Sequence, residues 1–521
     1  MAIKINNTTV IDNSRNITDV ENVGDANTVY YGDGSNLTNL PASGGTADFV
    51  ASGTIANGDT VVINSNGTVS TISGSGTVNP SVASEASIQS SATYTTAAYD
   101  TANNRVVVFY SDSAASNVHK AVVGTITGST VSFGSPVTVY GGTSYDKRAL
   151  YDPDNGRIIV LFKLASSAQL YSLTVNPSTN TLTTSGTAAL GNTQEPDMAY
   201  DTANNKVVIV YKDAGNTNRG TAVVATVTSS TVSVGTPVIF ETSGISSPSV
   251  TFDSVANKAV IAWLPTSTLR GTTATGTVSG TSISFGTKVQ VSGNEPTAIA
   301  CDYNPEIDRT VYYFPDKQSS SVATILLGKV SGTSISISKE FILPFASVLS
   351  TSTLGSLQYN PNNKSTTLVC RPFVFEDPYF VVAAEMIFDK NTLDVKISDA
   401  VPFGSATTTY INSVFNTSTN KINAIYIASS GVKATELTSS TFSSNYDGHN
   451  YIGVAAAAIS NAATGTITIG GGVNESQSGL TVGREYYVDP SGGLTLDKPT
   501  SLPVVTKAGT SISATKLIVK G

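Results

Sequence analysis

The stretch YDTANNRVVVFY, Tyr99–Tyr110, decides the fold of this chain because it recurs. It joins an aromatic residue and an Asp to a polar turn, and an apolar run follows the turn. Seven copies at regular spacing indicate a repeat protein. The copies begin at Tyr99, Tyr151, Tyr200, Phe252, Tyr303, Tyr359 and Phe415, at intervals of 52, 49, 52, 51, 56 and 56 residues.

One repeat predicts four antiparallel strands. ATYTTAAY, ending at Tyr99, forms the first strand, and in the turn Asp100 accepts backbone N–H bonds while Asn residues tolerate left-handed φ. RVVVFY, ending at Tyr110, is a nearly continuous apolar run, as expected for a strand buried on both faces. HKAVVGTI and TVSFG then alternate around a short turn, which is a hairpin signal.

Four strands in each repeat, with the repeat found throughout the middle of the chain, predict an all-β fold with a seven-bladed β-propeller of four-stranded antiparallel blades over residues 84–444. A string of independent β-sandwiches is the alternative, and it is disfavoured because a sandwich needs about 100 residues. The equivalent aromatic residues are expected to pack between blades. VASEASIQS, from Val82, could add a strand to the last blade.

The flanks differ in composition from the repeats. Residues 1–45 are polar and rich in turns, and residues 46–83 predict a small β module with Asn-Gly turns at Asn57 and Asn66. Residues 445–521 predict a C-terminal β module, in which EYYVDPSGGLTL, from Glu485, is a hairpin.

Composition excludes several classes of partner. Charged residues make up 13% of the chain, and the net charge is -8, which argues against nucleic-acid binding. No apolar run approaches the ~18 residues of a membrane span, so we expect no membrane insertion. MAIKINNTTV has no apolar core, so no signal peptide is expected. Cys301 and Cys370 are too few for a disulfide framework.

Catalytic and metal sites are not predicted. The two histidines, His119 and His449, lie in no nucleophile motif, so we expect no catalytic residue and no enzyme activity. DPDNG, with Asp152 and Asp154, could hold calcium, but it lacks the Glu and further oxygen ligands, and its sister turns read DTANN and NTSTN. A turn is favoured, and no metal or cofactor is predicted.

A glycosidase would need two carboxylates across a cleft. The sequence places several carboxylates near blade edges, but it lacks the Asp-box pattern SxDxGxTW and an arginine cluster. Glycan degradation is therefore the less favoured hypothesis. The carboxylates are Glu195, Asp197, Glu241, Glu295, Glu376 and Asp377.

Glycan binding without catalysis needs aromatic platforms and a few polar partners. RPFVFEDPYF, Arg371–Phe380, gathers both kinds of residue, and Tyr145 is a further aromatic candidate. The alternative is that these aromatics fill the core, which is favoured for Trp263. The predicted binding residues are Phe375, Glu376, Asp377, Tyr379, Phe380 and Trp263.

The two ends resemble proteins of bacteriophage particles. IKINNTTVIDNSRNITDV and YGDGSNLTNL resemble the opening of tail-fibre and other appendage proteins, especially those of cyanophages. Phe49–Val69, Gly479–Thr495 and Ala514–Gly521 resemble small β modules of virion fibre proteins. The resemblance covers about 150 residues at the two ends.

This resemblance implies a homotrimeric subunit of a tail fibre or spike, located in the virion. Residues 1–45 would attach it to other virion tail proteins, and the distal part would bind a host-surface glycan or receptor by multivalent, non-covalent contacts. Two alternatives remain open. One is a propeller glycosidase or lyase that degrades polysaccharide, and the other is a baseplate, collar or capsid scaffold without host contact.

Overall fold

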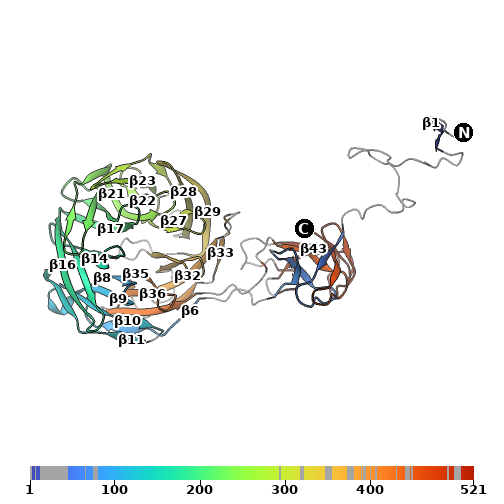
Figure 1. Ribbon diagram of the computed structural model, residues 1–521, viewed down its shortest axis with the longest axis horizontal. Coiled ribbons are helices and arrows are strands. Elements are labelled where there is room, and N and C mark those ends of the chain that lie inside the picture. The colour runs from blue at the N-terminus through green and yellow to red at the C-terminus, as the bar shows by residue number, and fades with distance from the viewer. Residues whose placement is uncertain are drawn as a thin grey trace.

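A computed structural model gives the architecture of the chain (Figure 1). It shows a ring of small sheets and a separate, smaller β body. The structure describes residues 3–5, 8–11, 45–64, 66–73, 80–128, 130–292, 295–316, 322–346, 355–371, 381–388, 390, 393, 395–398, 400–404, 408–429, 431–439, 446, 450–489, 492–497 and 506–520.

The repeated turn has the same geometry in every copy. The carboxylate of Asp100 is buried and accepts the backbone N–H groups of Ala102 and Asn103 at 3.1 and 3.0 Å. Asn104 then adopts a left-handed φ of 53°, so both predictions for this turn are confirmed. The equivalents of Asp100 are Asp152, Asp201, Asp253, Asn304, Asn360 and Asn416, all at most 2% exposed. The equivalents of Asn104 are Gly156, Asn205, Asn257, Asp308, Lys364 and Asn420, all with positive φ.

Each turn joins the innermost strand of a sheet to its neighbour, and the chain then runs outward by antiparallel pairing. The predicted all-β propeller is therefore confirmed. The first blade comprises β8 (Thr93–Asp100), β9 (Arg105–Asp112), the 3-10 turn η1 (Ser113–Ala115), β10 (Val118–Thr127), β11 (Thr130–Phe133) and β12 (Val137–Thr143). The second comprises β13 (Lys147–Asp152), β14 (Arg157–Lys163), β15 (Ala168–Asn176) and β16 (Thr181–Leu190), and the fifth β26 (Ala300–Asn304), β27 (Arg309–Asp316), β28 (Val322–Ser331) and β29 (Ser334–Ala346).

The third and fourth blades share one long strand, β21, whose first half pairs with β19 and whose second half pairs with β22. Dividing their nine-stranded sheet at β21 gives seven units among the described residues. The strands are β17 (Thr193–Asp201), β18 (Lys206–Asp213), β19 (Arg219–Val227), β20 (Val232–Val234), β21 (Val238–Asp253), β22 (Lys258–Pro265), β23 (Thr272–Ser279), β24 (Ser282–Phe285) and β25 (Val289–Gln290). The sixth blade has β30 (Ser356–Asn360), β31 (Ser365–Cys370), β32 (Val381–Phe388), β33 (Val395–Ile397) and β34 (Val401–Phe403).

The last blade takes its outer strand from the N-terminal side of the propeller. β6 (Ser81–Val82) and β7 (Ala86–Gln89) pair with β37, as the VASEASIQS pattern suggested, so the ring closes by joining distant parts of the chain. The propeller therefore begins at Ser81, three residues before the predicted boundary. The other strands of this blade are β35 (Thr408–Asn416), β36 (Lys421–Ala428) and β37 (Gly431–Thr438).

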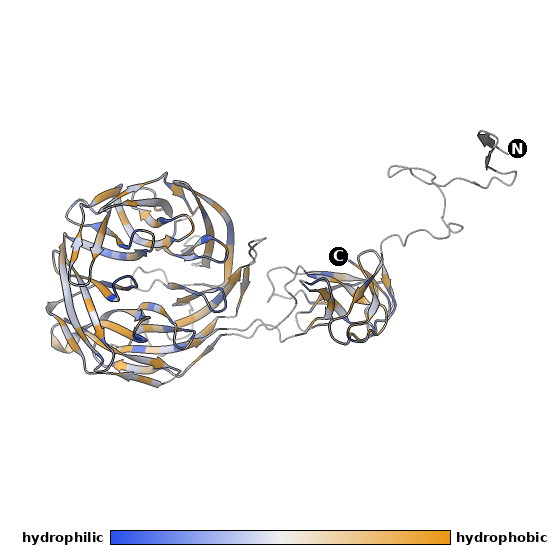
Figure 2. Cartoon of the chain, viewed as in Figure 1, coloured by the Kyte–Doolittle hydropathy of each residue, from blue (hydrophilic) through white to orange (hydrophobic). Residues whose placement is uncertain are grey.

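Apolar contacts between neighbouring blades hold the ring together. One cluster joins the first and last blades through Tyr99, Tyr110 and Ile425, and six further clusters join the remaining neighbours in order. The second strand of each blade is buried on both faces, as the apolar runs predicted; Val106–Asp112 is one example. Figure 2 shows hydrophobic residues concentrated in the strands.

The two flanks form a single body, whereas the sequence suggested separate modules. Strands from both flanks alternate in one sheet of order β3-β39-β38-β4-β5, and a second sheet has the order β40-β44-β43-β41-β42. The propeller is thus inserted between the two halves of this terminal body. Its strands are β3 (Thr46–Val50), β4 (Thr60–Ile63), β5 (Val69–Thr71), β38 (Tyr451–Ala455), β39 (Thr464–Thr468), β40 (Val473–Asn474), β41 (Glu485–Val488), β42 (Leu494–Thr495), β43 (Lys507–Ser511) and β44 (Leu517–Val519).

Within residues 1–45 the structure describes a small hairpin of β1 (Ile3–Ile5) and β2 (Thr8–Ile11), together with Gly45. Across the described part of the chain, no helix is long and apolar enough to cross a membrane.

Candidate functional site

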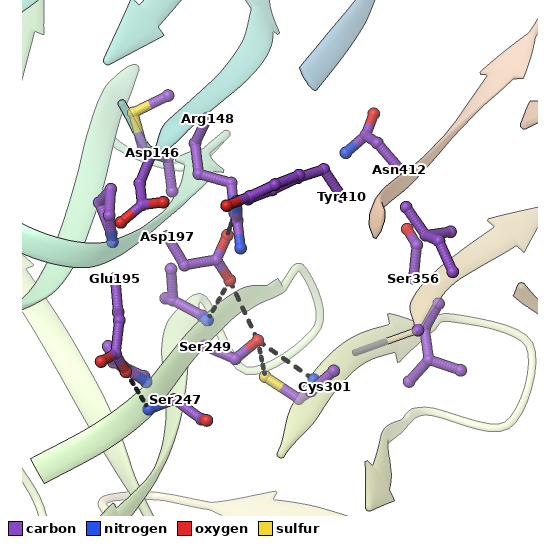
Figure 3. A pocket seen from close by; sticks show the side chains of 18 of the residues that line it. Asp146, Arg148, Glu195, Asp197, Ser247, Ser249, Cys301, Ser356, Tyr410 and Asn412 are labelled. Atoms are coloured by element: carbon purple, nitrogen blue, oxygen red, sulfur yellow. Dashed lines mark hydrogen bonds and ion pairs between the residues drawn. The ribbon is translucent and has the colours of Figure 1, made fainter. Parts of the chain in front are cut away.

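The innermost strands of all seven units line one cavity of about 310 Å³. Its walls come from the segment just before each repeated aromatic residue, so the repeat itself places seven equivalent backbones around the cavity. Figure 3 shows the side chains that reach into it. Differences between the repeats decide the chemistry of each wall.

A backbone irregularity recurs in four of the inner strands, and three of the residues involved line the cavity. Tyr94, Glu195, Ser247 and Tyr410 each lie five residues before a repeated aromatic, and each has a φ of 48° to 51°. At these points the pairing with the second strand shifts register. A left-handed residue other than glycine costs of order 1 kcal/mol, and such bulges commonly redirect side chains at functional sites.

Side chains two positions further along link neighbouring blades. Asp197 Oδ2 accepts the backbone N–H of Val250 at 2.9 Å, and Asn412 Oδ1 accepts that of Ala97 at 3.2 Å. The second bond joins the last blade to the first. Because these bonds involve backbone groups of the next blade, they fix the geometry of the cavity wall. The same bond runs from Cys301 to Ser249 at 3.2 Å and from Ser413 to Ser356 at 3.2 Å.

One wall of the cavity is charged. Arg148 Nε lies 3.3 Å from Asp197 Oδ1, and the Arg148 side chain is 44% exposed. Glu195 accepts the backbone N–H of Ser247 at 2.8 Å and pairs with Lys212 at 3.1 Å. Both pairs hold their carboxylates in fixed positions, which suits them to bind hydroxyl groups of a ligand.

The facing wall combines an aromatic ring and apolar residues with the polar side chains of Ser356 and Asn412. Tyr410 extends from its strand toward Arg148 and Asp197 (Figure 3), and Gly355, Leu357 and Ile411 continue that side of the lining. Behind Tyr410 lies Tyr94, with ring centroids 4.8 Å apart. Tyr145, an aromatic candidate from the sequence, stacks edge-on against Tyr94 at 5.7 Å. Burial, followed by the charges of nearby groups, raises the pKa of the Tyr410 phenol.

Asp302 is the most perturbed carboxyl of the lining. It accepts the backbone N–H groups of Tyr359 at 2.8 Å and Tyr303 at 2.9 Å. Burial raises the pKa of Asp302 to about 7, against the lowering effect of these hydrogen bonds, and the Asp197 charge adds a smaller upward effect. Asp302 is therefore a group that gains or loses a proton near neutral pH.

A fully buried lysine lies beneath the charged wall. Lys147 Nζ donates to Ser111 Oγ at 2.8 Å and to the Tyr145 carbonyl at 2.7 Å. Burial lowers the pKa of Lys147 well below its usual value. The Lys147 side chain therefore ties Ser111 of the first blade to the segment that carries Tyr145.

The structure corrects one predicted binding residue. The Trp263 side chain is 0% exposed and packs in the core between the third and fourth blades, 4.9 Å from Phe240. An apolar run places its side chain between sheets, so it cannot contact a ligand in the cavity. The remaining predicted binding residues, Phe375, Glu376, Asp377, Tyr379 and Phe380, lie outside the described residues.

The carboxylates proposed for the glycosidase hypothesis separate into two groups. Glu195 and Asp197 line the cavity together, whereas Glu241 pairs with Lys288 at 2.8 Å away from the lining, and Glu295 does not belong to it. Glu376 and Asp377 are outside the described residues, as is His449.

His119 is a core residue. Its ring stacks between Phe109 and Phe162, with centroids 5.7 and 4.2 Å away. No group of three or more metal-ligating side chains occurs among the described residues.

Sequence reasoning missed Asp146, Arg148, Tyr410 and Asn412. Aligning the repeats on their aromatic residues would have found them, because Tyr410 and Tyr94 occupy the same position. Arg148 stands where sister repeats have Thr96, Asp197, Ser249, Ala300, Ser356 and Asn412.

Comparisons with known proteins identify no family. No family model matches the chain, and no curated protein matches its sequence. Solved structures of similar fold include a protein of unknown function from Dyadobacter fermentans DSM 18053, with 12% identity and a TM-score of 0.38 over 70% of this chain and 98% of that one. Saccharomyces cerevisiae Sqt1 has 10% sequence identity and a TM-score of 0.43, and the match covers 70% of this chain and 100% of that one. The Dos1 propeller has 10% sequence identity and a TM-score of 0.39, and the match covers 68% of this chain and 95% of that one. The assignment of the fold therefore rests on the strand pairing of this chain.

Proposed function

We propose that this chain is a non-enzymatic attachment protein whose propeller binds a glycan in the central cavity. The observation that carries the proposal is the pairing of two unlike walls: Tyr410 faces Arg148 and Asp197 across one cavity. An aromatic ring stacks on the apolar face of a sugar, while fixed charged and amide groups bind its hydroxyls.

The size of the cavity suits a small part of a glycan. About 310 Å³ is at the lower end of the range for ligand pockets, which suits one or two sugar units of a longer chain. Asp146 and Asn412 supply further oxygen and amide groups at the lining. A single site of this kind binds weakly, so attachment would depend on several copies acting together.

The resemblance of the two ends to virion fibre proteins supports the wider proposal. We place the protein in a bacteriophage tail fibre or spike as a homotrimer, joined to other tail proteins through residues 1–45. Three propellers would then present three glycan sites, and avidity would strengthen attachment to the host. Sedimentation of the full chain tests the oligomer, because a monomer would reject the trimer.

A polysaccharide-degrading enzyme is the second candidate. The observation that favours it is the gathering of Glu195, Asp197 and Asp302 around one cavity, where the raised pKa of Asp302 would suit a general acid. Release of reducing ends from polysaccharide by the full chain would replace binding with catalysis as the proposed function.

The test of glycan binding uses an array of bacterial polysaccharides and the full-length chain. Tyr410→Ala should reduce binding at least tenfold because it removes the aromatic wall. Tyr487→Ala in the terminal body is the matched control and should leave binding unchanged. Binding that survives Tyr410→Ala, or no binding to any glycan, would reject the cavity as the attachment site.

A further inference from the structure

We propose that the sugar held in the cavity carries a carboxylate, and that Arg148 binds this group. The inference rests on the proposed glycan-binding function and names the chemical class of the ligand, an acidic saccharide such as a uronic acid. Three features of Arg148 support it: its place in the repeat, its free hydrogen-bonding capacity and its neighbours.

Arg148 departs from the repeat at a position where the structure does not need a cation. At this position Asp197, Ser249 and Asn412 accept a backbone N–H from the next blade. A guanidinium has no acceptor, so Arg148 cannot form this bond. Thr96 and Ala300 likewise form no such bond among the described residues, but Arg148 alone of the seven equivalent residues carries a positive charge, and it pairs instead with Asp197 of the next blade.

The Arg148 guanidinium has bonding partners at two of its nitrogen atoms. Its Nε faces Asp197 Oδ1 at 3.3 Å, and Nη1 donates to the Lys147 carbonyl at 3.0 Å. Within the described residues, Nη2 forms no hydrogen bond or ion pair, and the side chain is 44% exposed to the cavity. Two fixed contacts thus orient a planar fork whose remaining N–H groups match the two oxygens of a carboxylate.

The neighbours of Arg148 favour a sugar acid over a simple anion. Asp146 and Asp197 lie in the same wall, and a small free anion offers these carboxylates no hydrogen-bond donor. They would instead accept hydrogen bonds from sugar hydroxyls, while Tyr410 stacks on the ring. A ligand with both a carboxylate and several hydroxyls offers a partner to each of these groups.

The experiment measures binding of the full-length chain to oligogalacturonate and to the same oligosaccharide after its carboxyl groups are reduced to alcohols. The wild-type chain should bind the acidic form at least tenfold more tightly. Arg148→Gln should abolish this preference and leave equal, weaker binding to both forms. Arg148→Lys should restore part of the preference because it keeps the charge but not the fork. Arg270→Gln, on an exposed loop, is the matched control and should behave as wild type.

Thermal unfolding of each variant establishes that the propeller is folded. Equal binding of both forms by the wild-type chain, with binding still lost in Tyr410→Ala, would overturn the carboxylate inference and keep the cavity as a glycan site. A preference that persists in Arg148→Gln would overturn the role of Arg148. Absence of any Tyr410-dependent binding across the polysaccharide array and this pair would overturn the proposed function, and this inference with it.

Discussion

The repeated turn can be tested by a substitution series at Asp253, in the same blade as the single tryptophan of the chain. Asp253 is 1% exposed and accepts the backbone N–H groups of Val255 at 3.0 Å and Ala256 at 2.8 Å. Asp253→Ala removes both bonds, each worth about 1 kcal/mol net, so it should destabilise the propeller by about 2 kcal/mol. Asp253→Asn should cost less than about 1 kcal/mol, because the side-chain oxygen remains.

Three sister turns already carry Asn in place of Asp, namely Asn304, Asn360 and Asn416, and each of them accepts the backbone N–H of the residue two positions further along. Urea unfolding followed by fluorescence of Trp263, which is 0% exposed, measures the change in the propeller. Val255→Ala, at a side chain 61% exposed, is the control and should have almost no effect. Equal losses for Asn and Ala would refute the reasoning, since they would show that the carboxylate charge matters more than the acceptor.

Three further predictions concern buried groups. His119→Phe should raise the temperature of the unfolding midpoint, and the increase should be largest below pH 6. Burial, and then the charge of Lys147, lowers the pKa of His119 in the folded chain well below 6.5. Only the unfolded chain therefore gains a proton on this histidine at low pH, which favours unfolding. Asp302 should make stability change with pH in the opposite direction, because its pKa is about 7 in the folded chain and 3.8 in the unfolded chain. Its contribution to the free energy of unfolding should fall between pH 4 and 7, by at most about 1.4 kcal/mol per pH unit. Measured stability of Asp302→Asn against pH should lack this slope. Glu85→Ala should weaken the pairing of the N-terminal strands with the last blade, because Glu85 accepts a hydrogen bond from the Tyr426 phenol at 2.6 Å and pairs with Lys433 at 3.4 Å. Backbone hydrogen exchange should therefore become faster in β37 but not in β15.

The architecture was predictable because backbone requirements recur in the sequence. An acceptor after the aromatic residue and a left-handed position four residues later leave a clear signal, Asp100 and Asn104 in the first copy. The shared terminal body was not predictable, since pairing between β3 and β39 joins segments separated by the whole propeller. Local patterns describe each strand but do not identify its distant partner.

The candidate site was only partly predictable for a related reason. Glu195 and Asp197 were noticed as carboxylates, but nothing in their local sequence states that they meet Tyr410 across a ring. Trp263 attracted attention as the rarest residue type, yet its position in an apolar second strand is the stronger indicator and places it in the core. Rarity of a residue type says less about function than its position within the repeat.

Symmetry explains why the cavity, rather than any single blade, should carry the function. Residues that are the same in every repeat serve the ring, as the buried turn acceptors do, because a ring needs the same contact at each junction. A ligand is not sevenfold symmetric, so a site that recognises one must break the pattern. The inner strands break it most strongly where Arg148 replaces a small polar residue and where Tyr410 enters from the far wall. Arg148 is the one positively charged side chain among the seven equivalent positions of the inner strands, and recognition of an acidic group supplies a reason for this departure from the repeat.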